Sequence, residues 1–241
     1  MILELDKNRA GVGLRFWNSS LFLNAPRTEL EDDFQSDSYW GDTVMTGRGW
    51  SDRLPALPVS ASGLILGTCI SVYLLSLVAQ SFVNNYLALN PAYLLQRPWT
   101  LVTYMFVHAS FDHIFWNMLF LFLFGIELER RVGGKKFLII FFFSGIVAAL
   151  AQLLISPGVL VGASGALYGI MGCLAIIAPE IRVLLFFVIP LSIRAAVMLY
   201  AMVDFLSFGS ADNIAHMAHI TGLLIGILFG YFIKQQPKIL S

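Results

Sequence analysis

Long runs of apolar residues recur along the chain from residue 61 onward, and no other feature limits its fold as strongly. A transmembrane helix needs about 20 predominantly apolar residues. Backbone polar groups inside a bilayer must be satisfied within their own segment, which favours helices. We therefore predict an all-α, polytopic membrane protein built as a bundle of six transmembrane helices. The six apolar runs are 61–83, 113–128, 137–156, 162–178, 193–208 and 213–233.

The composition agrees with this fold class and excludes one class of partner. Hydrophobic residues make up 58% of the 241-residue chain and charged residues 12%, whereas charged residues make up about 25% of a typical soluble domain. The formal net charge is zero, and no cluster of Lys and Arg is interleaved with aromatic residues. A nucleic-acid-binding surface would need such a cluster. We therefore expect membrane lipid, and no nucleic acid, among the partners.

The first part of the chain differs in composition from the rest. It mixes polar and apolar residues and ends near two breaks, Pro55 and Pro58. We predict an N-terminal cytoplasmic tail or small appendage at residues 1–59, a six-span core at residues 60–236, and a cytoplasmic C-terminal tail at residues 237–241.

Positively charged residues indicate how the spans are oriented. They gather in alternate connections and in the C-terminal tail, whereas the opposite connections contain only Arg97. Cationic loops are retained on the cytoplasmic side, so we expect both termini to be cytoplasmic. The bacterial plasma membrane is the simplest location for a chain without an organelle address. The residues that set this orientation are Arg48, Arg53, Arg130, Arg131, Lys135, Lys136, Arg182, Arg194, Lys234 and Lys238.

The histidines of the chain gather at the outer ends of two predicted spans. They are His108, His113, His216 and His219, and Asn117 lies one helical turn beyond His113. Residues four apart share a helix face, so the side chains of His113 and Asn117 are candidate donors to an oxyanion. The alternative is a structural role, in which His113 and Asn117 form hydrogen bonds between helices. No role is assigned to His108 or His216.

A serine opens the fourth predicted span, in the turn Gly162-Ala163-Ser164-Gly165. Polar side chains at membrane depth are functional candidates, since they are unfavourable there without partners. The free N–H groups at the start of a helix also favour a developing negative charge. Ser164 is therefore a candidate nucleophile and His219 its general base. Considered alone, a glycine-flanked serine in an apolar helix is usually a packing residue.

Small residues allow the fourth and sixth predicted spans to pack closely, as the Ser164–His219 pair requires. Gly165 and Gly169 lie four residues apart in the fourth span, and Gly222, Gly226 and Gly230 repeat the interval in the sixth. With a rise of about 1.5 Å per residue, His219 is expected about 10 Å along a helix that starts near residue 213.

Two other hydrolytic sites fit the sequence less well. The turn around Ser164 lacks the second glycine of a soluble hydrolase elbow, since residue 166 is Ala. Four histidines could bind zinc, but they do not follow the HExxH spacing.

These motifs together resemble those of the rhomboid family of intramembrane serine proteases. The segment from His108 through His113 to Asn117 is similar to the second-span motif of that family. The turn Gly162-Ala-Ser164-Gly165 is similar to its GxSG motif, and Ala218-His219-Ile-Thr-Gly222 to its AHxxG motif. The three motifs also occur in the order of the family.

The resemblance implies a catalytic dyad without a required carboxylate. Ser164 would be the nucleophile and His219 the base, with the Tyr168 ring packed on the imidazole. His113, Asn117 and backbone N–H groups at the Gly162 turn would bind the oxyanion and the substrate.

The resemblance also implies the wider function. The substrates would be transmembrane proteins that enter when the fifth span and the outer loops move aside, and no cofactor would be needed. Glu129 and Arg131 match a structural Glu-x-Arg feature, and Trp99 matches a first-loop tryptophan, whereas Thr100 departs from the usual arginine. The alternatives are a catalytically silent rhomboid-like protein that binds transmembrane clients, and a transporter or channel.

Overall fold

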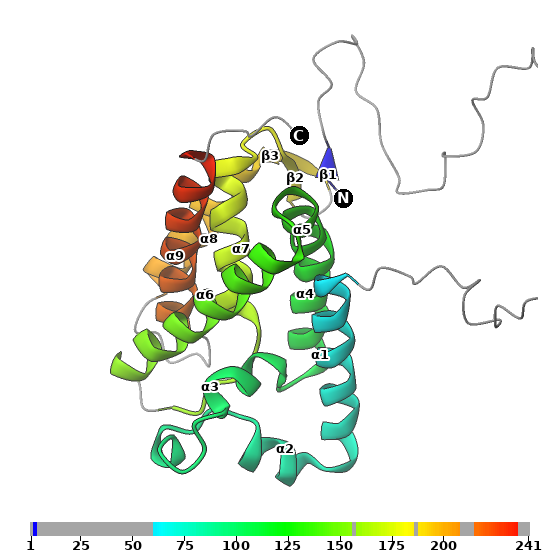
Figure 1. The fold of residues 1–241 in the computed structure, drawn as a ribbon, viewed down its shortest axis with the longest axis vertical. Coiled ribbons are helices and arrows are strands. Elements are labelled where there is room, and N and C mark those ends of the chain that lie inside the picture. The colour runs from blue at the N-terminus through cyan, green and yellow to red at the C-terminus, as the bar shows by residue number, and fades with distance from the viewer. Residues whose placement is uncertain (1, 4–59, 156–157, 186–187, 208–214, 236–241) are drawn as a thin grey trace, which may run out of the picture. The chain divides into compact units, whose positions relative to one another are not determined.

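Helices make up most of the described chain, which confirms the prediction of an all-α membrane protein. The computed structural model describes residues 2–3, 60–155, 158–185, 188–207 and 215–235 (Figure 1). Apart from Ile2–Leu3, the predicted appendage 1–59 lies outside this part of the chain, as does the predicted tail 237–241.

Four helices of the described chain are long and apolar enough to cross a membrane, so the protein is an integral membrane protein. They are α1 (Ala61–Val78), the continuous helix Phe111–Val132, α6 (Gly134–Ile155) and α9 (His216–Gln235). Large apolar side chains on their outer faces are exposed, as expected for contact with lipid. Examples are Leu64, Leu74, Phe122, Phe143, Leu154, Leu224 and Phe232.

The other two predicted spans are helical but shorter. They are α7 (Ser164–Ile177) and α8 (Ile193–Leu206), of 14 residues each. At about 1.5 Å per residue each is about 21 Å long, less than the hydrocarbon core of about 30 Å. The count of six spans therefore stays a prediction.

The first two predicted spans have different ends in the structure. The backbone of Ala79 leaves the helical region, at φ −134° and ψ 46°, so the run 61–83 is divided into α1 and α2 (Gln80–Tyr86). The second span starts at Phe111, two residues before its predicted start, because the Ser110 side chain caps it by accepting from the His113 N–H.

The second span is not a regular α-helix throughout. It consists of α4 (Phe111–Phe120), the π-helical segment η4 (Leu121–Gly125) and α5 (Ile126–Val132). Single π-helical turns of this kind often lie near functional sites.

The long connection between the first two spans is folded into short helices. They are η2 (Pro91–Tyr93), α3 (Thr100–Thr103) and η3 (Tyr104–Phe106). The Trp99 indole donates to the carbonyl of Tyr86 at 2.8 Å, and the Arg97 guanidinium lies over the Tyr86 ring. Leu95 is 93% exposed. Exposed apolar and aromatic side chains in such a loop favour a position in the membrane interface.

A small hairpin that the sequence analysis did not predict joins α7 to α8. Strands β2 (Arg182–Leu185) and β3 (Ile189–Ser192) pair antiparallel, with Arg182 opposite Ser192. The two-residue strand β1 (Ile2–Leu3) pairs with β2.

Glycine contacts bring α7 and α9 together, and the predicted close packing of these helices is confirmed. A Cβ atom on Gly222 would overlap with the carbonyl oxygen of Gly165, and one on Gly226 with that of Gly169. The two backbones therefore touch where side chains would otherwise separate them. In Figure 1, α6, α7 and α9 run side by side.

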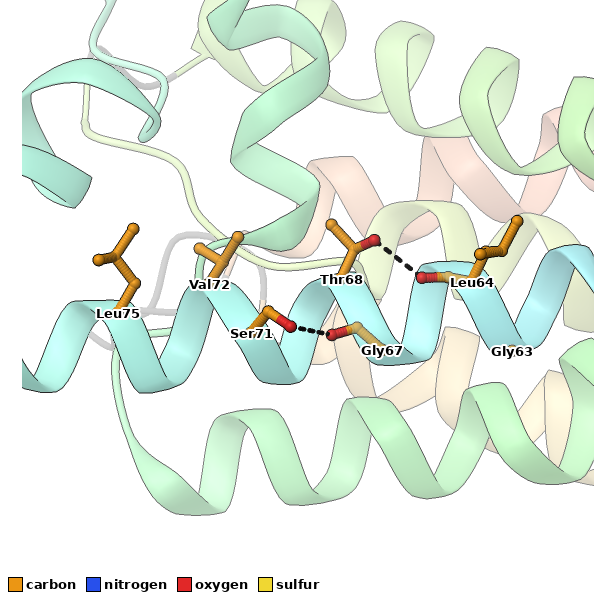
Figure 2. Close-up of a pocket in the computed structure, with 7 residues that line it drawn as sticks. All are labelled: Gly63, Leu64, Gly67, Thr68, Ser71, Val72 and Leu75. Atoms are coloured by element: carbon orange, nitrogen blue, oxygen red, sulfur yellow. Dashed lines mark hydrogen bonds between the residues drawn. The ribbon is translucent and has the colours of Figure 1, made fainter. Parts of the chain in front are cut away.

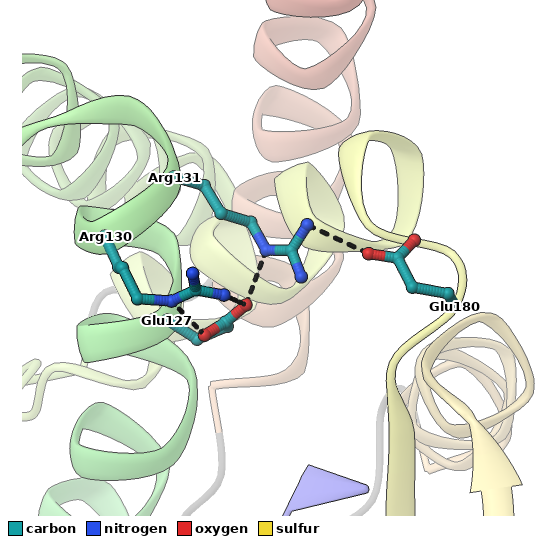
Figure 3. Close-up of polar contacts among 4 residues, drawn as sticks. All are labelled: Glu127, Arg130, Arg131 and Glu180. Atoms are coloured by element: carbon teal, nitrogen blue, oxygen red, sulfur yellow. Dashed lines mark hydrogen bonds and ion pairs between the residues drawn. The ribbon is translucent and has the colours of Figure 1, made fainter. Parts of the chain in front are cut away.

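Ionic and polar contacts also join the bundle where α1 begins and where α5 and α7 end. The carboxylate of Glu129 accepts from the backbone N–H groups of Ala61 and Ser62, at 2.7 and 2.8 Å, and thereby caps the start of α1. Arg131 binds Glu127 and reaches Glu180 beyond α7 at 2.9 Å (Figure 3). Glu129 thus joins α5 to the start of α1, and Arg131 joins α5 to the turn that follows α7.

Candidate active site

Ser164 and His219 meet across the interface between α7 and α9. The Ser164 Oγ atom lies 2.8 Å from Nε2 of His219, although 55 residues separate them in the sequence. Both side chains are partly buried. Ser164 is the first residue of α7, so the positive end of the helix dipole faces it. The pair thus has the contact that a nucleophile and its general base require.

The His219 ring is held from α7 as well. The rings of Tyr168 and His219 are stacked, with centroids 4.4 Å apart and an interplanar angle of 8°. Tyr168 lies one helical turn after Ser164, on the same face of α7. One face of one helix therefore contacts both the edge and the flat side of the imidazole.

Gly162 places the turn against the second span. Its φ of 109° lies in a region that favours glycine. A Cβ atom at Gly162 would lie only 2.6 Å from Nε2 of His113, so the backbone approaches the imidazole directly. The Gly162 N–H donates to the carbonyl of Tyr104 at 2.9 Å. His113 thus lies beside the turn that precedes Ser164, as the sequence motifs require.

Asn117 and His108 are less directly connected to this pair. The Asn117 side-chain N–H donates to the carbonyl of His113 in its own helix at 2.8 Å. Among the described residues, no hydrogen bond joins Asn117 to Ser164 or to His219. The His108 ring meets the His113 ring edge to face, with centroids 5.0 Å apart.

An acidic residue that the sequence analysis missed lies behind His219. Asp204 of α8 is 4% exposed, and its Oδ1 atom lies 3.0 Å from Nδ1 of His219. The same oxygen lies 2.7 Å from Nδ1 of His216, a residue to which the sequence alone assigns no role. The available signal was a carboxylate inside a predicted span, because charges at membrane depth are rarely present without a partner.

His219 lies nearer the start of its helix than expected. The helix α9 begins at His216 and not near residue 213. Three residues correspond to a rise of about 4.5 Å, less than half of the predicted depth. Just before His219, the N–H of Ala218 donates to the side-chain oxygen of Gln152 in α6 at 3.2 Å, so a third helix supports this turn.

Asp204, His216 and His219 also meet the spatial requirement for a metal site. One potential ligand atom from each lies within 4.8 Å of the others. Two imidazoles and one carboxylate form a donor set that suits zinc and other transition metals. Hydrogen bonds between Asp204 Oδ1 and the two histidines explain the same arrangement without a metal.

Two hollows in the described chain are lined by residues other than this pair. One is a shallow groove of about 430 Å³ along α1, where Thr68 and Ser71 donate to backbone carbonyls of their own helix (Figure 2). The other, of about 290 Å³, lies between α1, α2 and the loop at His108, and polar side chains from Ser76, Gln80 and Asn84 contribute to its lining. The second hollow reaches the His108 side of the site.

The His108 ring is kept neutral by its surroundings. Burial lowers the pKa of His108 to about 4, and the neighbouring His113 adds to this effect. With 3% of its surface exposed, a protonated His108 would be poorly solvated.

Comparisons with known proteins show to what this chain is similar. The sequence profile of the Rhomboid domain matches residues 95–236. Rhomboid-like protease 3 of Toxoplasma gondii is 30% identical over 210 residues, which cover 83% of this chain and 77% of that protein.

Two further relatives match over shorter shares of their own length. RHOMBOID-like protein 6, mitochondrial, of Arabidopsis thaliana is 33% identical over 149 residues, which are 58% of this chain and 45% of that protein. Rhomboid protease GlpG of Yersinia pestis (strain Pestoides F) is 30% identical over 186 residues, 75% of this chain and 64% of that protein. The matched region thus spans less than two thirds of each of these two proteins.

Proposed function

Because the chain belongs to the rhomboid family, we propose that it is an intramembrane serine protease, an endopeptidase that hydrolyses peptide bonds in or near transmembrane segments of membrane proteins. The observation that carries the proposal is the distance of 2.8 Å between Ser164 Oγ and His219 Nε2. Relatives named as rhomboid proteases support it.

The reaction begins with proton transfer within this pair. His219 Nε2 takes the hydroxyl proton of Ser164 while the oxygen attacks the carbonyl carbon of the substrate peptide. The carbon–nitrogen bond then breaks, and the leaving amine takes the proton from His219. Water attacks the resulting acyl-enzyme by the same route, which releases a carboxylate product and restores the Ser164 hydroxyl.

The negative oxygen formed during attack needs donors. The backbone N–H of Ser164, at the free start of α7, is one candidate. His113 is a second, since its Nε2 adjoins Gly162. Asn117 is a third candidate, because an amide nitrogen carries two hydrogens and the contact with His113 O uses only one.

Substrate would enter from the lipid. Transmembrane proteins are the proposed partners, and the fifth predicted span, α8, is the proposed entry gate. In support, α8 exposes several large apolar side chains: Met198, Met202, Val203, Phe205 and Leu206.

The orientation with both termini in the cytoplasm remains an inference from charge. The cluster formed by Arg130, Arg131, Lys135 and Lys136 at the joint between α5 and α6 supports it. Relatives include proteins named as mitochondrial as well as bacterial ones, so the bacterial plasma membrane remains a prediction.

Labelling with a serine-reactive fluorophosphonate tests the proposal without a known substrate. The detergent-solubilised wild-type protein should be labelled at Ser164. Labelling should disappear in Ser164→Ala and His219→Ala. If the folded wild-type protein is not labelled, or if Ser164→Ala is labelled equally, the protease proposal is wrong. A catalytically silent protein that binds transmembrane clients would be folded but would not be labelled.

A further inference from the structure

Asp204 forms a third member of the site on a separate helix. Ser164 comes from α7 and His219 from α9, whereas Asp204 lies near the end of α8. We infer that Asp204 is a positioning residue, which orients His219 through Nδ1 so that the base works within a Ser164–His219–Asp204 triad instead of a dyad. This inference rests on the proposed function.

The tautomer of His219 leads to this role. To accept the Ser164 proton, Nε2 must be unprotonated, so the proton of a neutral ring has to be on Nδ1. A buried N–H needs an acceptor. Asp204 Oδ1, at 3.0 Å from that nitrogen, supplies it. The carboxylate thus stabilises the one tautomer that can act as a base toward Ser164.

The same contact favours the charged ring that forms during the reaction. When the Ser164 proton moves to Nε2, both ring nitrogens carry hydrogens and the imidazole becomes a cation. An adjacent carboxylate stabilises this cation without taking a proton itself, as in serine protease triads. The Nδ1 proton therefore stays on His219 throughout.

His216 holds the carboxylate in place for this task. It lies three residues before His219, and its Nδ1 lies 2.7 Å from the oxygen that also faces His219. His216 and Asp204 are both buried, at 6% and 4% exposure. Two imidazoles on one face of α9 therefore fix a single oxygen atom of α8.

Because Asp204 lies on a different helix from Ser164 and His219, the triad is complete only when α8 is in the right position. Glycine contacts lock α7 and α9 together, so the distance between Ser164 and His219 is set by a rigid interface. The contact of Asp204 with His219 depends instead on where α8 lies. If α8 moves to admit a substrate, it has to return before the carboxylate can orient the base.

Asp204→Asn tests the inference, since it keeps the shape and removes the charge. The measured quantities are the maximal rate of labelling by a fluorophosphonate and the probe concentration that gives half of this rate. The maximal rate should fall by about 13- to 160-fold, the factor expected when one hydrogen bond to a charged group is lost. The half-saturating concentration should change little. Asp204→Glu should recover part of the rate.

Controls separate this role from a structural one. Glu180→Gln makes the same chemical change at a carboxylate outside the site, whose ion pair is with Arg131, and it should label at the wild-type rate. The thermal unfolding midpoint of each variant shows whether it is folded. Ser164→Ala shows whether labelling depends on the proposed nucleophile.

Two results would overturn the inference while leaving the protease proposal intact. One is a wild-type labelling rate in folded Asp204→Asn. Another is a faster rate, which would show that Asp204 is a latch that holds α8 closed. Loss of wild-type labelling on treatment with a chelator would overturn both proposals, because it would assign Asp204, His216 and His219 to a metal and leave His219 unable to accept the Ser164 proton. Labelling that persists in Ser164→Ala would instead overturn the protease proposal.

Discussion

The ring of Tyr168 lies parallel to the ring of His219, with centroids 4.4 Å apart and an interplanar angle of 8°. The stacked ring restricts rotation of the imidazole about its side-chain bonds. The contacts with Ser164 and Asp204 lie in the plane of the imidazole, whereas Tyr168 covers its face. The imidazole of His219 is therefore held within its plane by Ser164 and Asp204 and on its face by Tyr168.

Removing the aromatic ring at position 168 should slow the reaction of Ser164. An aromatic pair contributes about 0.5 to 1.5 kcal/mol, so Tyr168→Ala should lower the fluorophosphonate labelling rate by about 2- to 12-fold. Tyr168→Phe keeps the ring and removes only the hydroxyl, which interacts with Asp204, so its rate should lie between those of the Ala variant and the wild-type protein. Equal rates for the Ala variant and the wild-type protein would show that the stack has no role in catalysis.

Gly162→Ala should abolish most labelling because the new Cβ atom would collide with the His113 ring. Gly133→Ala is a useful comparison. Gly133 also has a positive φ, 82°, but a Cβ atom there would meet nothing within 4 Å. Both variants should lose about 1 to 3 kcal/mol of stability through backbone strain. Only Gly162→Ala should lose activity per folded molecule; comparable losses in both would exclude a specific role for the His113 contact.

Gly226→Ala should destabilise the pair of helices that carries Ser164 and His219. The added methyl group would overlap with the backbone of Gly169, and overpacking of this kind costs about 1 to 3 kcal/mol. Gly67→Ala adds the same methyl group to α1 with no atom within 4 Å, so it should leave the unfolding midpoint unchanged or raise it. Thermal unfolding in detergent measures both. A neutral Gly226→Ala would contradict the close packing of α7 and α9.

Acid should weaken the fold through His108. Its pKa is about 4 in the folded protein and about 6.5 in the unfolded chain. Between these values the unfolded chain binds more protons, so the contribution of His108 to stability is complete above pH 6.5 and is lost as the pH falls toward 4. The unfolding midpoint of His108→Gln should therefore depend less on pH over this interval than that of the wild-type protein. Parallel curves for the two proteins would contradict the prediction.

Glu129→Gln should loosen the start of α1 without affecting the chemistry of the site. The carboxylate accepts from two backbone N–H groups and from the Ser62 hydroxyl. Loss of its charge should destabilise the protein by about 1 to 3 kcal/mol. The labelling rate of the folded fraction should equal that of the wild-type protein. A slower rate at full folding would mean that α1 affects the site.

The sequence predicted the main helices and the Ser164–His219 contact for identifiable reasons. Apolar length predicts spans, and small residues at four-residue intervals predict which spans touch. The stacking of Tyr168 on His219 follows from the resemblance to the rhomboid family, in which a tyrosine four residues after the serine packs on the imidazole. The break at Ala79 and the hairpin at Arg182–Ser192 depend on local backbone geometry that apolar composition does not encode.

Asp204 was missed because its partners are distant in sequence and its own helix carries no motif. Twelve residues separate it from His216, with residues 208–214 outside the described chain. The significance of a lone carboxylate in an apolar run depends on which helix face it occupies and on what packs against that face. Only the three-dimensional arrangement of α8 and α9 supplies this information.

The π-helical segment Leu121–Gly125 sets the angular phase between the two halves of the second span. A wider turn accommodates one extra residue, and each residue of an α-helix rotates the following side chains by about 100°. Deleting one residue here would keep His113 and Asn117 on their face while it turned Glu129 away from the start of α1. The second span therefore makes two sets of contacts, one through His113 and Asn117 and the other through Glu129, that a regular α-helix could not make at the same time.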